Sequence, residues 1–158
     1  IRKRATTIID TSKTTTKELR RKIIQLFGKG GELPPMNIVV QSFGFKYGIP
    51  LDCDMVFDVR FLPNPFYISE LKNLCGNDQP VKDYIQEKPV TREFEEKLFA
   101  LIQFLLPQYV QEGKSQLMIG VGCTGGRHRS VFIANQLGGF IEKCGYGVQV
   151  IHRDLIKK

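Results

Sequence analysis

A strand, a glycine-rich turn and a helix start follow one another between residues 117 and 137, and this pattern constrains the chain more than any other. The apolar run 117–121 enters the turn, four glycines lie within 120–126, and an apolar helical pattern runs over 131–137. Such a turn aims several backbone N–H groups at one point, and the helix dipole adds partial positive charge there. Further donors come from the side chains of Arg127, His128 and Arg129. The pattern therefore predicts a binding site for an anion, with phosphate as the best fit.

Apolar runs and helical patterns alternate along the rest of the chain. Strands are expected over residues 6–9, 36–43, 55–61, 117–121 and 148–151, and helices over 15–27, 69–74, 80–86, 91–109 and 131–143. A capping-box pattern, Thr15 with Glu18, marks the start of the first helix. The alternation predicts the α/β fold class, with a mostly parallel sheet flanked by helices. Ligands of such sheets bind at the carboxyl ends of the strands, so we expect the loops after residues 43, 60 and 123 to converge.

A stretch rich in glycine and proline, residues 28–35, predicts a boundary between a short part, 1–31, and a larger part, 32–158. The apolar share of 42% and the charged share of 25% are typical of a soluble globular protein. No apolar run approaches the roughly 18–20 residues of a membrane span. The start Ile1–Arg4 has neither a Met nor a following apolar segment, so we expect a fragment or processed chain without a signal peptide and without membrane attachment.

The four cysteines form no C-x-x-C pair, and we expect free thiols in a reducing cytoplasm. The net charge of +7 has two readings, a solvated basic surface or a footprint for a polyanion such as RNA. Neither a G-x-x-x-x-G-K-[ST] phosphate loop nor a dinucleotide fingerprint occurs in the sequence, so no cofactor is expected. Cys123 and His128 lack a second pair of ligands at a suitable spacing, so no metal site is expected either.

Cys123, Arg129 and Ser130 also match the C-x5-R-S loop of cysteine-dependent phosphatases. In that chemistry a thiolate attacks phosphorus and an arginine clamps the phosphoryl oxygens. Non-covalent phosphate binding is the favoured reading, because Gly122 stands where those enzymes usually have His and no segment supplies a general acid. Cys123 would then contribute its N–H and sulfur beside the backbone donors of Thr124, Gly125 and Gly126. A purely architectural turn in an oligomerisation module is the third alternative.

Other polar residues follow the first two strands of the larger part. Lys46 lies among Phe43, Phe45 and Tyr47. These aromatic residues either pack in the core or form a base-stacking platform. The ammonium of Lys46 can reach an anion. Asp58 and Arg60 alternate with apolar residues, and two readings stay open. They form a buried ion pair, or they line a polar pocket together with Asn64 and bind the sugar end of a ligand.

Three segments of the chain, 42–50, 57–65 and 122–130, together resemble the C-terminal half of the RapZ/YvcJ family of bacterial RNase adapter and nucleotide-binding proteins. The resemblance covers roughly residues 33–158. Residues 1–31, with Ile8-Ile9-Asp10-Thr11-Ser12, resemble the last strand and helix of that family's N-terminal P-loop NTPase half. Full-length members bind and hydrolyse ATP or GTP through that half, so the resemblance implies no enzyme activity for this chain.

The resemblance implies a regulatory binding domain that senses an amino-sugar phosphate and, in some members, binds small RNA. It places the phosphosugar at Cys123 through Ser130, with Lys46 nearby. It also implies self-association and a ribonuclease or regulatory protein as partner. RNA contacts are expected at the basic end, at Arg153, Lys157 and Lys158. Phe66 stands where the best-known RNA-binding members have His, and the tail is less basic than theirs, which weakens the RNA expectation.

Overall fold

A computed structural model describes residues 6–27 and 36–157. The chain forms two compact units, residues 1–35 and 36–158. In the first unit, helix α1 (Thr16–Phe27) begins at the predicted capping box, which is confirmed. The N–H of Thr15 donates to Glu18 Oε2 at 2.9 Å, and the N–H of Glu18 donates to Thr15 Oγ1 at 3.3 Å.

The strand predicted over residues 6–9 is wrong, because this segment is irregular. A β-branched run becomes a strand only where a partner strand offers backbone hydrogen bonds, and the described part of this unit contains none. The predicted end of the helix at Gly28 and the linker over 28–35 lie outside the described residues.

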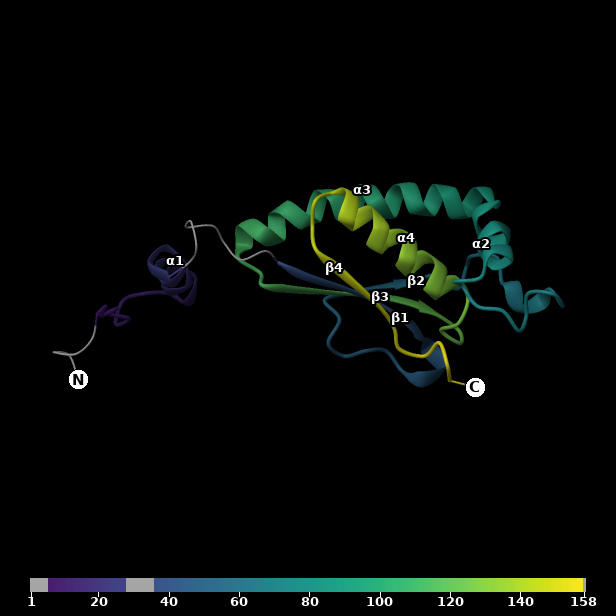
Figure 1. Ribbon diagram of the computed structural model, residues 1–158, viewed down its shortest axis with the longest axis horizontal. Coiled ribbons are helices and arrows are strands. Elements are labelled where there is room, and N and C mark those ends of the chain that lie inside the picture. Colours follow the sequence, from purple (N-terminus) through teal and green to yellow (C-terminus); the bar gives the residue numbers. More distant parts are fainter. Residues whose placement is uncertain (1–5, 28–35, 158) are drawn as a thin grey trace. The chain divides into compact units, whose positions relative to one another are not determined.

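The second unit is built on a four-stranded, all-parallel sheet in the order β2-β3-β1-β4 (Figure 1). Its strands are β1 (Asn37–Gly44), β2 (Met55–Asp58), β3 (Gln116–Cys123) and β4 (Val148–His152). The predicted α/β fold with a mostly parallel sheet is confirmed. Strand β2 ends three residues before the predicted limit, because Asp58 Oδ1 accepts the N–H of Arg60 at 2.9 Å and turns the chain.

Three helices flank this sheet: α2 (Gln79–Gln86), α3 (Pro89–Glu112) and α4 (Arg129–Lys143). In Figure 1, α3 and α4 lie on one side of the sheet, and the connection from β1 to β2 passes on the other side. That connection includes the short 3-10 helix η3 (Phe45–Tyr47), and a second one, η4 (Pro65–Tyr67), follows β2. The helix predicted over residues 69–74 is wrong, because hydrogen-bonded turns occupy this segment.

The core lies between the sheet and the helices. Alternate residues of β1 and β3, such as Ile38 and Ile119, are fully buried against Ile133 and Leu137 of α4. On the opposite face, a Cβ at Gly122 would lie 2.5 Å from the ring of Phe43. Glycine in β3 therefore makes room for an aromatic side chain of β1. No helix among the described residues has the length and apolar character needed to cross a membrane.

Candidate anion-binding site

The carboxyl ends of three parallel strands bring three loops together. Gly44 pairs with Cys123 and Asp58 pairs with Gly122, so the chain leaves β1, β2 and β3 at the same edge of the sheet. The N–H of Lys46 donates to the carbonyl of Thr124 at 3.2 Å and ties the first loop to the third. Two of the three loops that were expected to converge are thus joined by a direct contact.

Glycine is required where these two loops touch. A Cβ at Gly44 would lie 2.6 Å from the carbonyl carbon of Gly125, and a Cβ at Gly126 would lie 2.6 Å from the N of Gly44. Gly126 also has a φ of 73°, a left-handed conformation that residues with a side chain rarely adopt. The close approach of the two backbones therefore depends on both glycines.

A cavity of about 480 Å³ opens at this edge of the sheet. Eight residues predicted for the ligand line it: Lys46, Asn64, Cys123, Thr124, Gly125, Arg127, His128 and Arg129. Five more complete the lining: Phe66, Tyr67, Lys72, Asn73 and Lys157. Five of the lining side chains are cationic, and none of the described residues that line it is Asp or Glu. The cavity therefore has the charge expected of an anion site.

Arg129 is the first residue of α4 and is only 5% exposed. Its Nη1 donates to the carbonyls of Arg60 and Leu62, and its Nη2 lies 3.4 Å from Thr124 Oγ1. Its Nε is buried and has no hydrogen-bond partner in the described part of the chain. Burial lowers the pKa of Arg129 below its ordinary value. One arm of the predicted clamp thus holds the loop after β2, which leaves Nε and Nη2 for a ligand.

The neighbouring residues Arg127 and His128 have different roles. Arg127 donates through Nε to the carbonyl of Leu74 at 3.0 Å and through Nη2 to the carbonyl of Asn73 at 2.7 Å, so it anchors the turn after η4. His128 is 8% exposed, and its Nε2 lacks a hydrogen-bond partner within the described residues. Burial lowers the pKa of His128, so the ring is neutral at neutral pH. A phosphate would meet a neutral imidazole there and not an imidazolium.

Cys123 lies at the floor of the turn with its side chain buried. Its Sγ accepts the N–H of Gly126 at 3.3 Å and lies 3.2 Å from Ser130 Oγ. Gly126 and Ser130 do not line the cavity. The N–H of Gly126, predicted as a donor to the ligand, is therefore hydrogen-bonded to Cys123 Sγ. Thr124 and Gly125 line the cavity.

Asp58 and Arg60 form an ion pair, with 2.6 Å between Arg60 Nη2 and Asp58 Oδ2. The expectation that these charges are buried is wrong, because their side chains are 43% and 50% exposed. Neither residue lines the cavity. The guanidinium of Arg60 lies over the ring of Phe45, 4.2 Å from its centroid, and this contact holds it beside the site.

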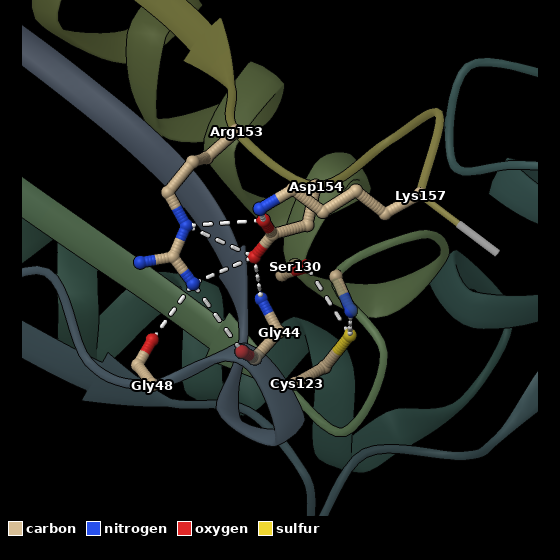
Figure 2. A network of polar contacts seen from close by, with 8 residues as sticks. Gly44, Gly48, Cys123, Ser130, Arg153, Asp154 and Lys157 are labelled. Atoms are coloured by element: carbon tan, nitrogen blue, oxygen red, sulfur yellow. Dashed lines mark hydrogen bonds and ion pairs between the residues drawn. The ribbon is translucent and has the colours of Figure 1, made fainter.

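The basic end of the chain is organised around one buried carboxylate, Asp154 (Figure 2). Asp154 Oδ2 accepts the N–H of Gly44 at 2.8 Å and pairs with Arg153 Nη2 at 2.7 Å, and Lys157 Nζ lies 2.8 Å from Oδ1. Arg153 also donates to the carbonyl of Gly48 at 2.7 Å. Arg153 and Lys157, the residues predicted for RNA, thus pair with the buried Asp154, and their side chains remain 25% and 48% exposed. Lys158 lies outside the described residues.

Four lining residues were not predicted from the sequence: Phe66, Tyr67, Lys72 and Asn73. They belong to η4 and the turns after it, a segment predicted only as a strand stop and a short helix. The sequence feature that could have indicated these residues is Asn64-Pro65 after β2. Loops at the carboxyl ends of parallel strands are where ligands of such sheets bind.

These features define the protein as a parallel α/β domain with a cationic pocket at the carboxyl edge of its sheet. Residues 36–156 match the RapZ C-terminal domain, and the chain belongs to the RapZ/YvcJ family. The predicted resemblance is thereby confirmed.

Curated relatives extend the match over nearly the whole chain. A nucleotide-binding protein of Thermoanaerobacter sp. (strain X514) is 54% identical over 155 residues, which cover 98% of this chain and 55% of that relative. A nucleotide-binding protein of Caldanaerobacter subterraneus subsp. tengcongensis is 55% identical over the same length and coverage. One of Clostridium acetobutylicum is 53% identical over 152 residues, 96% of this chain and 52% of the relative. The chain thus spans about half the length of these relatives.

Proposed function

We propose that this chain is the regulatory, ligand-binding part of a RapZ-family protein and that its pocket binds a phosphorylated metabolite. One observation carries the proposal: five cationic side chains and no carboxylate of the described residues line a cavity of about 480 Å³. Lys157 pairs with Asp154, but the like charges of Lys46, Lys72, Arg127 and Arg129 repel each other, and a dianion relieves that repulsion. Each hydrogen bond from a charged donor to the phosphate adds about 1.5–3 kcal/mol.

Two buried nitrogen atoms support the same reading. Arg129 Nε and His128 Nε2 have no hydrogen-bond partner within the described residues, and both side chains line the pocket. A buried polar group without a partner costs about 1–3 kcal/mol. A phosphate oxygen would accept a hydrogen bond from Arg129 Nε. A water molecule or a ligand hydroxyl would donate to His128 Nε2, because the neutral ring uses its one N–H on backbone carbonyls.

The proposed ligand class has a first candidate in the amino-sugar phosphates that the family resemblance implies. In this arrangement the phosphate lies against Thr124, Gly125 and Arg129. The amides of Asn64 and Asn73, which line the same cavity, then face the hydroxyl or amino groups of the sugar. Neutral amides both donate and accept, so they suit the mixed polar groups of a sugar.

Calorimetry and thermal shift with inorganic phosphate, glucosamine 6-phosphate, glucose 6-phosphate and unphosphorylated glucosamine test the proposal. We expect the phosphorylated compounds to raise Tm, because a ligand at 100 times its Kd adds about 2.7 kcal/mol of stability, and glucosamine to leave Tm unchanged. Lys46→Ala removes a lining charge and should weaken phosphate binding about tenfold, equal to about 1.4 kcal/mol. The matched control is Lys97→Ala, an exposed lysine of α3 outside the pocket. Absence of saturable binding by every phosphate compound would contradict the proposal.

The alternative function is a cysteine-dependent phosphatase. Cys123 would be its nucleophile, and its sulfur accepts an N–H at the base of the turn. Protonation of a leaving group needs an acid, and none of the described lining residues is a carboxylic acid. We therefore expect binding without turnover. Hydrolysis of a chromogenic phosphomonoester at pH 6 that disappears in Cys123→Ser would establish the enzyme instead.

For the full-length protein we propose RNA and a ribonuclease or regulatory protein as partners, in a homo-oligomer. The net charge of +7 supports the RNA part. Electrostatic contacts to phosphates release counterions, so complexes with structured RNA should weaken steeply as salt rises. A gel shift without any salt-sensitive complex would count against RNA binding.

A further inference from the structure

Two exposed aromatic rings stand at the mouth of the same pocket. Phe66 and Tyr67 line it, yet 49% and 81% of their surfaces are exposed. Their ring centroids lie 6.1 Å apart in an edge-to-face arrangement. Large aromatic side chains usually contribute to a core, so this pair does not owe its position to packing.

The backbone beneath these rings is held in place. Asn64 Oδ1 accepts the N–H of Phe66 at 3.3 Å, and Pro65 between them is buried. Proline has a fixed φ, and the capped turn restricts the residues after it. The rings are therefore presented to solvent by an ordered segment.

Cations lie beside these rings. Lys72 Nζ is 4.8 Å from the centroid of Phe66 and lines the pocket. Lys46, which also lines the pocket, has its ammonium 4.6 Å from the centroid of the Tyr47 ring. Aromatic surfaces next to positive charge are the combination that binds nucleotides, because bases stack on the rings while cations hold the phosphate.

We infer that the pocket takes a nucleoside phosphate, with the phosphate at residues 124–129 and the base stacked on Tyr67 and Phe66. The inference rests on the proposed function, since it needs phosphate at the turn, and it adds a subsite that a phosphosugar alone does not fill. Every base has a stacking face, so the subsite tolerates different bases. The nucleoside phosphate is supplied as a free mononucleotide or as an unpaired nucleotide of an RNA.

Calorimetry on the 158-residue chain tests the subsite with inorganic phosphate, ribose 5-phosphate, AMP and UMP. Ribose 5-phosphate carries the same phosphate without a base. We expect AMP and UMP to bind at least about fivefold more tightly than ribose 5-phosphate, because stacking contributes about 1–3 kcal/mol per base. Tyr67→Ala and Phe66→Ala should each reduce this excess, taken as the ratio of the AMP or UMP affinity to the ribose 5-phosphate affinity, a ratio from which any change in phosphate binding cancels.

Control variants and matched ligands decide the outcome. Phe104→Ala, which removes a 64% exposed ring of α3 outside the pocket, should retain the excess, and Tyr67→Phe should retain it too. Equal affinities for AMP, UMP and ribose 5-phosphate, or an excess that survives in the Phe66→Ala/Tyr67→Ala double variant, would overturn the inference. Failure of inorganic phosphate, ribose 5-phosphate and both nucleotides to bind would instead overturn the proposed function.

Calorimetry with a 5′-phosphorylated hexaribonucleotide without secondary structure shows whether the nucleotide is part of an RNA or a free metabolite. If RNA supplies the nucleotide, the oligonucleotide binds more tightly than AMP or UMP, and Tyr67→Ala weakens it. If the free metabolite is the ligand, the oligonucleotide binds no better than the mononucleotides. Both results retain the subsite and assign its occupant.

Discussion

Asp154 provides a measurable link between the end of the chain and the pocket. Its carboxylate is fully buried, and burial alone would raise its pKa. The hydrogen bonds from Arg153, the N–H of Gly44 and Lys157 outweigh burial and lower the pKa from 3.8 to about 2. At 1.36 kcal/mol per pKa unit, this fall corresponds to about 2.5 kcal/mol of stability.

Asp154→Asn keeps the shape of the side chain and one acceptor for Gly44 but removes the charge. We expect the free energy of unfolding to fall by about 2–3 kcal/mol at pH 7. Because the folded pKa is depressed, the wild-type carboxylate contributes fully above its ordinary pKa and loses this contribution as the pH falls from about 4 towards 2. The difference between wild type and variant should therefore shrink to about 1.3 kcal/mol at pH 3.

Urea titrations at pH 7 and pH 3, followed by far-UV circular dichroism and tyrosine fluorescence, measure this difference. The sequence contains no Trp, so tyrosine is the fluorescent probe. Asp58→Asn is the matched control, because it removes an equally short ion pair at 2.6 Å whose side chains are 43% and 50% exposed. An exposed pair contributes about 0–1 kcal/mol. The reasoning is refuted if both variants lose the same stability at pH 7, or if the Asp154→Asn difference is the same at both pH values.

Two further predictions concern His128 and helix α4. Burial lowers the pKa of His128, so the Kd for sulfate should change less than about twofold between pH 8 and pH 6.5. Calorimetry checks this, and a tenfold tightening across that range would show that the ring binds as imidazolium. Gly139→Ala should stabilise the protein by about 0.5–1 kcal/mol, because no atom lies within 4 Å of the added Cβ and alanine favours a helix. Gly138→Ala should destabilise it by about 1–3 kcal/mol, since the new Cβ would overlap Val150 Cγ2. Urea unfolding separates the two, and equal effects would contradict the packing argument.

Periodicity and turn chemistry predicted most elements of the larger unit. The four strands of the sheet and α2, α3 and α4 lie where apolar runs and helical stripes placed them. Predictions from the local sequence pattern were wrong where contacts between distant residues determine the secondary structure. Residues 6–9 have strand-forming side chains without a partner strand, and residues 69–74 form turns anchored by the guanidinium of Arg127.

The candidate site was accessible to sequence reasoning only in part. The turn at 123–129 could be found because glycine, cysteine and arginine at that spacing have few other uses. The individual hydrogen bonds of the site could not be predicted from the sequence. The sequence does not show that Arg129 Nη1 holds the carbonyls of Arg60 and Leu62, or that Gly126 donates to sulfur.

The order of residues by itself determined the parallel α/β class and the glycine-rich turn for which we propose anion binding, because side-chain periodicity and glycine placement act over short distances along the chain. The tertiary structure decided which distant side chains surround that turn. One cavity is lined by residues that are distant in the sequence, among them Lys46, Tyr67, Lys72 and Lys157. They come together because the loops that follow parallel strands lie at the same edge of the sheet. Such contacts depend on sheet order and register, which no local pattern encodes.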